Sequence, residues 1–162
     1  FNEIDIGDYR TFYRLDPPLR PESDRQALVE AVRDGLIDAI TSAHCPEPAE
    51  NKRRPFAEAA PGAVGLETLL PAALMLHHEH GLDLLDVLRP LTQGPAGLLG
   101  LDAGVLAQGA PADLVLFDAG APVVVDAATL RSKSKNSPFD GRRLQGKVLL
   151  TVVGGRIVHD AR

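Results

Sequence analysis

The chain has 162 residues, of which 44% are hydrophobic and 24% charged, and its formal net charge is −5. This composition is typical of a globular protein and excludes a disordered or fibrous one. The chain is acidic, and the basic cluster at residues 131–135, with Arg142 and Arg143 nearby, is expected to be a solvated loop. Nucleic-acid binding is not expected, because that affinity depends on a surface rich in Lys and Arg.

Cysteine use and hydropathy indicate the compartment. Cys45 is the only cysteine, which excludes an internal disulfide and fits a reducing environment. No signal peptide and no uncharged stretch of about 18 residues is present, so we expect a cytoplasmic protein without membrane contact. The first residue is Phe1 and not Met, which suggests a fragment or a processed product.

The N-terminal part leads into a rigid loop. A short strand or helix is expected near residues 9–13, followed by Arg14-Leu-Asp-Pro-Pro-Leu-Arg20. Two consecutive prolines exclude a helix there, so the segment is expected to be extended and to present Asp16 and Arg20 at fixed angles. The alternative is a plain connector with an exposed arginine.

A helix and a strand follow in direct succession. Ser23 is expected to cap a helix over residues 24–34, and Gly35 to end it. The short apolar run after Gly35 predicts a core strand over residues 36–42. A helix followed at once by a buried strand is typical of a parallel α/β fold.

The polar stretch after this strand is the candidate active-site edge. In an α/β barrel the catalytic residues lie where the strands end, and residues 43–64 form a loop long enough to be functional. Gly65 is expected to open a helix that runs to Glu79, with Pro71 causing a kink or a later start.

Three histidines, His77, His78 and His80, stand at the end of that helix. They are consistent with a metal site, but partly protonated imidazoles also interact favourably with a helix C-terminus. Because no third ligand is near in sequence, we favour the second interpretation and predict no metal ligands in this chain.

The C-terminal third changes character at Gly100. Two short helices are expected over residues 83–91 and 93–99, the first capped by Asp83. Beyond them, β-branched runs and a Gly154-Gly155 hairpin signal indicate a small antiparallel β unit. We therefore divide the chain into an α/β part, residues 1–99, and a flanking β-sandwich part with the C-terminal tail, residues 100–162.

Several motifs, in this order, resemble the C-terminal half of dihydroorotases, members of the amidohydrolase superfamily. They are Arg14-Leu-Asp-Pro-Pro-Leu-Arg20 with Asp24-Arg25, the segment 40–46, Pro55-Phe56 with Pro61-Gly62, Gly65-Leu-Glu-Thr68, Gly109-Ala-Pro-Ala-Asp-Leu114, and Ser132-Lys-Ser-Lys-Asn-Ser-Pro-Phe139.

The resemblance implies the C-terminal part of a metal-dependent hydrolase (β/α)8 barrel of the TIM type. In the family, early strands supply His ligands and a carboxylated Lys for zinc, and the last strand supplies an Asp that moves the proton. The reaction interconverts carbamoyl aspartate and dihydroorotate in pyrimidine synthesis. Since a closed barrel needs roughly 250 residues, the early strands are expected upstream of Phe1, in a separate N-terminal half.

The sequence departs from the family pattern at the site itself. Where the family has Thr/Ser-Asp-His-Ala-Pro-His, this chain reads Ser42-Ala43-His44-Cys45-Pro46-Glu47. Ala43 stands at the position of the catalytic Asp, and an alanine methyl group accepts no proton.

Two further departures concern the substrate. Glu47 replaces a substrate-contacting His, and Asp16 replaces an Asn that holds substrate, which would place a carboxylate near an anionic ligand. Of the family's substrate contacts, Arg20, Pro61 and Gly62 are kept. His44 is expected to support the site from behind the ligands, or to be a hydrogen-bonded structural histidine.

Three hypotheses follow. The first is a non-catalytic, dihydroorotase-like subunit, a pseudoenzyme that forms homo-oligomers or associates with aspartate transcarbamoylase, as the resemblance implies. The second is an active zinc-dependent cyclic amidohydrolase with an altered site, in which Glu47 replaces the missing base. The third is a domain with a packing role only.

Overall fold

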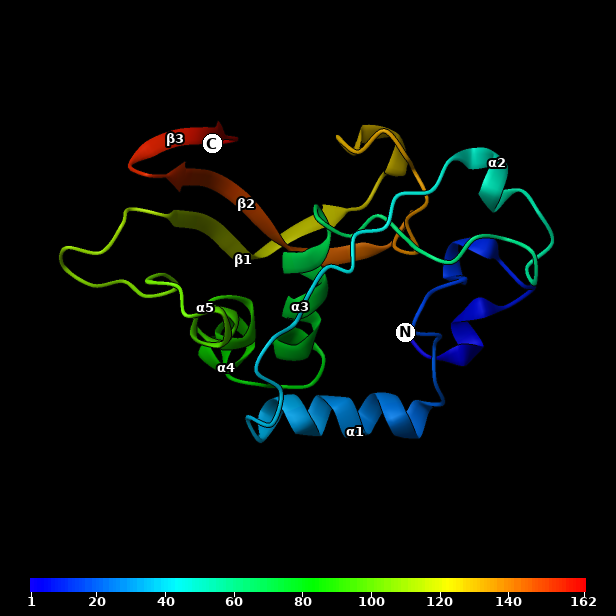
Figure 1. The fold of residues 1–162 in the computed structure, drawn as a ribbon, viewed down its shortest axis with the longest axis horizontal. Coiled ribbons are helices and arrows are strands. Elements are labelled where there is room, and N and C mark those ends of the chain that lie inside the picture. Colours follow the sequence, from blue (N-terminus) through cyan, green and yellow to red (C-terminus); the bar gives the residue numbers. More distant parts are fainter. The chain divides into compact units, whose positions relative to one another are not determined.

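A computed structural model describes all residues from 1 to 162 (Figure 1). The helices are α1 (Glu22–Arg33), α2 (Ala49–Lys52), α3 (Leu69–His78), α4 (Leu84–Leu88) and α5 (Gln93–Leu99), with 3-10 turns η1 (Glu3–Ile6), η2 (Thr11–Tyr13), η3 (Arg89–Leu91) and η4 (Ala127–Thr129). The strands are β1 (Leu114–Val124), β2 (Arg143–Val153) and β3 (Arg156–Asp160). None of the helices has the length and apolarity that crossing a membrane requires.

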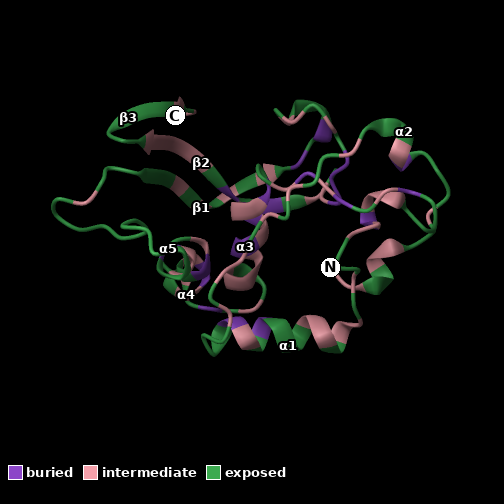
Figure 2. Cartoon of the chain, in the orientation of Figure 1, coloured by how far each residue is buried: buried purple, intermediate pink, exposed green.

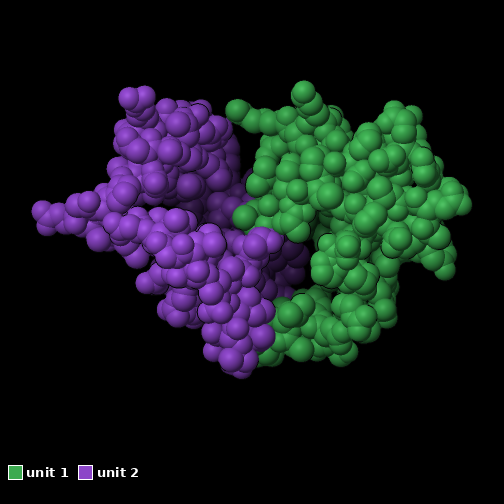
Figure 3. Space-filling model, viewed as in Figure 1, with its two compact units in different colours: residues 1–30, 42–69, 124–142 green, residues 31–41, 70–123, 143–162 purple.

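The chain forms two compact units, each assembled from separate stretches of sequence (Figure 3). Unit 1 contains residues 1–30, 42–69 and 124–142. Unit 2 contains residues 31–41, 70–123 and 143–162.

The predicted first helix is present, but its start was placed wrongly. It begins at Glu22, so Ser23 lies inside the first turn, and the carbonyl of Pro21 accepts the amides of Asp24 and Arg25. The predicted end is confirmed. Gly35 has φ +70°, and its amide donates to the carbonyl of Val32 while the next amide reaches back to Ala31, which is the Schellman arrangement.

The predicted strand over residues 36–42 is wrong as a strand. A strand needs a neighbour with which to exchange hydrogen bonds, and this stretch has no ladder in the chain. The Ile40 amide instead donates to the carbonyl of Pro90 in η3 at 2.8 Å. The nearest β interaction is a single parallel bridge between His44 and Ala63.

The later helices follow the sequence signals closely. α3 starts at Leu69, which confirms the late start that Pro71 predicted. Asp83 caps α4, its carboxylate accepting the Leu85 amide at 2.8 Å. α5 has the predicted bounds and ends at Gly100, with φ +65°.

The β unit is a three-stranded sheet in the order β1-β2-β3. β2 and β3 pair antiparallel around Gly154-Gly155, as predicted, with a bulge between Thr151 and Val152. Gly146 lets α3 approach β2, because a Cβ there would lie 2.4 Å from a methyl carbon of Leu74.

Buried residues occur in both units (Figure 2), and the buried polar residues lie in one of them. Unit 2 buries aliphatic side chains, among which Leu74 and Val87 are completely inaccessible. All four buried polar or charged residues belong to unit 1; they are Lys52, Thr68, Asn136 and Ser137. Since buried polar groups must be paired, the interior of unit 1 requires specific hydrogen bonds to these four residues.

Candidate functional site

The predicted active-site loop lies in unit 1, where residues 42–47 run beside residues 61–65. The Cys45 amide donates to the carbonyl of Ala63 at 2.7 Å, next to the parallel bridge that joins Ala63 to His44. The two ends of the predicted loop, residues 43–64, thereby lie side by side.

His44 is fixed by backbone amides. Its Nδ1 accepts from the amides of Gly65 at 3.1 Å and Leu66 at 3.4 Å. A ring nitrogen that accepts hydrogen bonds carries no proton, so the neutral ring has its proton on Nε2. Of the two roles expected for His44, this geometry favours the hydrogen-bonded structural histidine.

Asn136 joins the two sides of the loop. Its side-chain amide donates to the carbonyls of Gly62 at 3.1 Å and Cys45 at 3.4 Å, and its side-chain oxygen accepts the Glu47 amide at 3.3 Å. Its own carbonyl accepts the amide of Val64. With 3% of its surface exposed, Asn136 uses both ends of its carboxamide inside the protein.

Glycines permit the close approach of the two stretches. Gly62 is buried with φ +125°, and a Cβ there would lie 2.8 Å from the Cys45 sulfur. A Cβ on Gly65 would lie 2.4 Å from the Ser42 carbonyl oxygen. Both distances are shorter than real Cβ contacts, so these two glycines set the width of the site.

Ala43 is exposed and has φ +43°, in the left-handed region. Its methyl group supplies neither a proton acceptor nor a metal ligand. Glu47, the expected surrogate, is half-buried, and its Oε2 accepts from the Asn51 side chain at 2.9 Å.

The predicted substrate contacts separate into two groups. Gly62 belongs to the hydrogen-bonded cluster around Asn136, with exposed Pro61 beside it. Asp16 and Arg20 are exposed, and no hydrogen bond or ion pair joins their side chains to that cluster. The Arg20 guanidinium instead pairs with Asp24 at 3.1 Å on the surface of α1.

The chain does not fit a zinc site by its own residues. No group of three His, Cys, Asp or Glu side chains is placed to hold a metal ion. At the helix end, His77 contacts the carbonyl of Leu82 at 2.7 Å and His78 that of Ala119 at 2.9 Å. No chemical step through a metal is therefore derived from these residues.

Sequence reasoning missed three residues that build the site: Lys52, Glu67 and Asn136. Glu67 accepts the amides of Arg131 and Ser132, between 2.8 and 3.2 Å, and so holds the loop that carries Asn136. Glu67 and Asn136 lie in the quoted motifs, which was a usable signal. Nothing in the sequence around Lys52 indicates that its ammonium group is buried.

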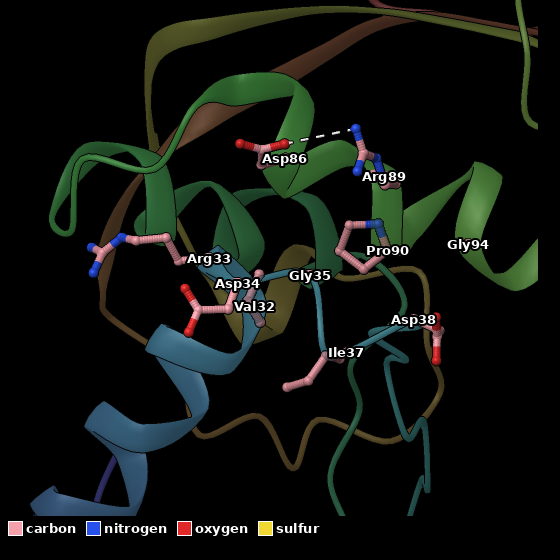
Figure 4. A pocket seen from close by; sticks show the side chains of 10 residues that line it. All are labelled: Val32, Arg33, Asp34, Gly35, Ile37, Asp38, Asp86, Arg89, Pro90 and Gly94. Carbon is pink, nitrogen blue, oxygen red and sulfur yellow. Dashed lines mark ion pairs between the residues drawn. The ribbon is translucent and has the colours of Figure 1, made fainter.

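A separate cavity of about 180 Å³ lies in unit 2 (Figure 4). Its charged lining includes Asp86 and Arg89, whose side chains pair at 3.9 Å, while those of Arg33 and Asp38 point in different directions. The cavity is lined by Val32, Arg33, Asp34, Gly35, Ile37, Asp38, Asp86, Arg89, Pro90 and Gly94. None of the predicted site residues belongs to it.

Comparison with known proteins defines the class of protein. The model of the amidohydrolase family matches residues 14–158, so the chain belongs to this family. That membership and the match to solved structures below confirm the predicted fold class, part of an amidohydrolase barrel with a small β unit.

Within the family, the curated relatives are dihydroorotases, which confirms the resemblance. The chain is 47% identical to that of Anaplasma phagocytophilum (strain HZ) over 160 residues and 45% identical to that of Anaeromyxobacter dehalogenans over 159. These alignments cover 99% and 98% of the chain but 36% and 37% of the relatives. The chain thus spans about a third of their length.

Solved structures of cyclic amidohydrolases also match most of the chain. The L-hydantoinase (dihydropyrimidinase) from Arthrobacter aurescens has a TM-score of 0.91 at 34% identity, covering 99% of this chain and 37% of that one. A D-hydantoinase structure has a TM-score of 0.84 at 24% identity, covering 93% and 34%, and supports the fold alone. The division at residue 99 stays a prediction.

Proposed function

We propose that the chain is part of a dihydroorotase-type protein of pyrimidine biosynthesis that does not itself catalyse the interconversion of carbamoyl aspartate and dihydroorotate. The observation that carries this proposal is Ala43, which stands where the family pattern has the proton-transferring Asp. Hydrolysis of an amide needs a group that removes a proton from water and returns it to the leaving nitrogen. A methyl group does neither.

The hydrogen bonds and packing of the surrounding loop support the proposal that the scaffold is retained although the catalytic group is absent. The His44 ring, the Asn136 carboxamide and the two close-packed glycines are all engaged in shaping the loop. Asp16 adds a carboxylate where an anionic substrate would approach. The scaffold motifs and the substrate contacts Arg20, Pro61 and Gly62 are therefore kept, while Ala43, Glu47 and Asp16 depart from the family pattern.

The test is an assay of the full-length protein with dihydroorotate and carbamoyl aspartate, with and without added zinc. We expect no turnover in either direction. Restoring the family residues together, with Ala43→Asp, Glu47→His and Asp16→Asn, is expected to give measurable turnover. The matched control carries Ala43→Asn in place of Ala43→Asp, has the same shape without a carboxylate, and is expected to stay inactive. Turnover by the unmodified protein would refute the proposal.

The second candidate is an active cyclic amidohydrolase that uses Glu47 as its base. The observation in its favour is that Glu47 is a half-buried carboxylate held on the same loop, with its amide bonded to Asn136. Against it, Glu47 lies four residues after Ala43, and its Oε2 is bonded to Asn51. Bound zinc in the purified full-length protein, together with turnover that Glu47→Gln abolishes, would favour this candidate over the first.

A non-catalytic subunit needs a partner, and we propose either further copies of the same protein or aspartate transcarbamoylase. Co-expression with aspartate transcarbamoylase followed by size-exclusion chromatography with light scattering distinguishes the two. A protein that is monomeric and does not bind aspartate transcarbamoylase would contradict both proposed partners.

A further inference from the structure

Lys52 ends the short helix α2 and is a buried cation. Only 4% of its surface is exposed. Its Nζ donates to three backbone carbonyl oxygens, those of Ala60 at 2.7 Å and of Thr11 and Arg14 at 3.2 Å each. An ammonium group has three N–H bonds, so all of its donors are in use. Burial lowers the pKa of Lys52, and the nearby Glu47 carboxylate partly opposes this shift.

The three carbonyls come from two stretches that Lys52 joins, residues 11–14 and the stretch around Ala60. Thr11 belongs to η2, Arg14 begins the Pro-Pro loop, and Ala60 precedes Pro61. Other hydrogen bonds reinforce the same junction. The Gly62 amide also donates to the Arg14 carbonyl, at 2.9 Å, and the Thr11 hydroxyl donates to the Lys52 carbonyl at 2.6 Å.

We propose that Lys52 is a positioning residue of the ligand site, which holds the loop bearing Asp16 and Arg20 against the Pro61-Gly62 turn. Because its three donors are occupied by backbone, its ammonium group does not bind ligand; it acts through the two segments that do. The identity of the ligand, a cyclic amide carrying a carboxylate, rests on the proposed function. The junction itself rests on the contacts alone.

Removal of the ammonium group leaves three carbonyls converging on a site without a donor. Each buried carbonyl that loses its partner destabilises the arrangement, because it has given up its hydrogen bonds to water and no longer has a protein donor to replace them. The two segments then separate until water reaches them. Lys52→Met removes the donors while it keeps the unbranched apolar stem.

The experiment uses the full-length protein and compares Lys52→Met with Lys147→Met, an exposed lysine on β2. Hydrogen–deuterium exchange is followed in peptides that cover residues 11–16 and 60–64, with the β2–β3 hairpin as internal reference. We expect roughly tenfold faster exchange in the two segments for Lys52→Met, and no change for Lys147→Met. Unchanged exchange, or an equal increase in the hairpin, would overturn the proposal.

The second readout is the affinity for dihydroorotate, measured by calorimetry. A purely structural lysine would leave the dissociation constant unchanged in protein that is still folded, whereas a positioning residue weakens binding, here by roughly tenfold. If Lys52→Met does not fold, Lys52→Gln, which keeps two donors, is measured in the same way. An unmodified protein that does not bind dihydroorotate would refute the proposed ligand, and the exchange data would still decide the role of Lys52.

Discussion

Ala43 has a backbone conformation that suits an aspartate better than an alanine. At φ +43° its Cβ crowds the backbone, and among residues other than glycine this region is enriched in Asn and Asp, whose short polar side chains bond locally. The family pattern has Asp at this position. The conformation of this turn is therefore one that the Asp of the family pattern would adopt more readily than alanine.

Replacing Ala43 by glycine is expected to stabilise the protein. Glycine has no Cβ and adopts positive φ freely, so Ala43→Gly should raise the free energy of unfolding by about 1 kcal/mol. Urea denaturation measures the change. The control is Ala27→Gly at an exposed position of α1, where glycine is expected to lower the free energy of unfolding by about 0.5–1 kcal/mol. Equal destabilisation by both substitutions would mean that Ala43 is not strained.

At the level of single residues, motifs in the sequence select candidate site residues but do not show how the candidate site is built. Ala43, Glu47 and Gly62 were found by their place in motifs, and they do lie on the two adjoining stretches. The roles of Lys52 and Asn136 depend on partners up to 41 and 91 residues away. Such contacts follow from the fold, and no local pattern predicts them.

At the scale of structural elements, Gly65 and Gly97 can be compared by the space that a Cβ would find at each position. A Cβ on Gly65 would meet the Ser42 carbonyl oxygen at 2.4 Å, while one on Gly97, an exposed residue of α5, would meet nothing within 4 Å. Gly65→Ala is expected to lower the free energy of unfolding by about 2 kcal/mol, because backbone must move.

Gly97→Ala is expected to raise the free energy of unfolding by up to about 1 kcal/mol, because alanine favours a helix. Thermal and urea denaturation of both variants check these signs. A Gly65→Ala protein as stable as the original would show that residues 42 and 65 do not pack closely.

The start of α1 should respond to acid through Glu22. The pKa of Glu22 is lowered from 4.5 to about 2, mainly by the hydrogen bond from Arg25 and further by those from Asn2 and Gln26. The ionised form is therefore favoured in the folded state. Its contribution to stability is complete above pH 4.5 and is lost as the pH falls towards about 2.

Glu22→Gln should therefore destabilise the protein at neutral pH, and the difference from the original protein should shrink through this window. Urea denaturation between about pH 2 and 6 measures it. In an Arg25→Met background, Glu22→Gln is expected to have a smaller pH-dependent effect. A difference that stays constant with pH would contradict the role of Glu22.

Elements defined by local signals were predictable, and those defined by distant partners were not. The bounds of α5, the Asp83 cap and the Gly154-Gly155 hairpin each follow from a few neighbouring residues. Residues 36–42 have the composition of a core strand, but a ladder needs a second strand, and in this chain their neighbour is η3.

For the molecule as a whole, the two units cut across the predicted division at residue 99. Unit 1 needs residues 124–142, since Asn136 binds both sides of the active-site loop and Glu67 binds the amides of Arg131 and Ser132. The polar interior of the site is thus completed by sequence far beyond the α/β segment.

If the full-length protein is truncated after Leu99, its active-site loop should therefore become less ordered. Without Asn136, the Val64 amide and the Cys45 and Gly62 carbonyls have lost a hydrogen-bond partner, so hydrogen–deuterium exchange over residues 42–66 should be faster. A protein that stops after Val153 keeps every residue of unit 1 and should keep this protection. Equal protection in both truncated proteins would show that the loop forms without Asn136, and would favour residues 1–99 as an independent folding unit.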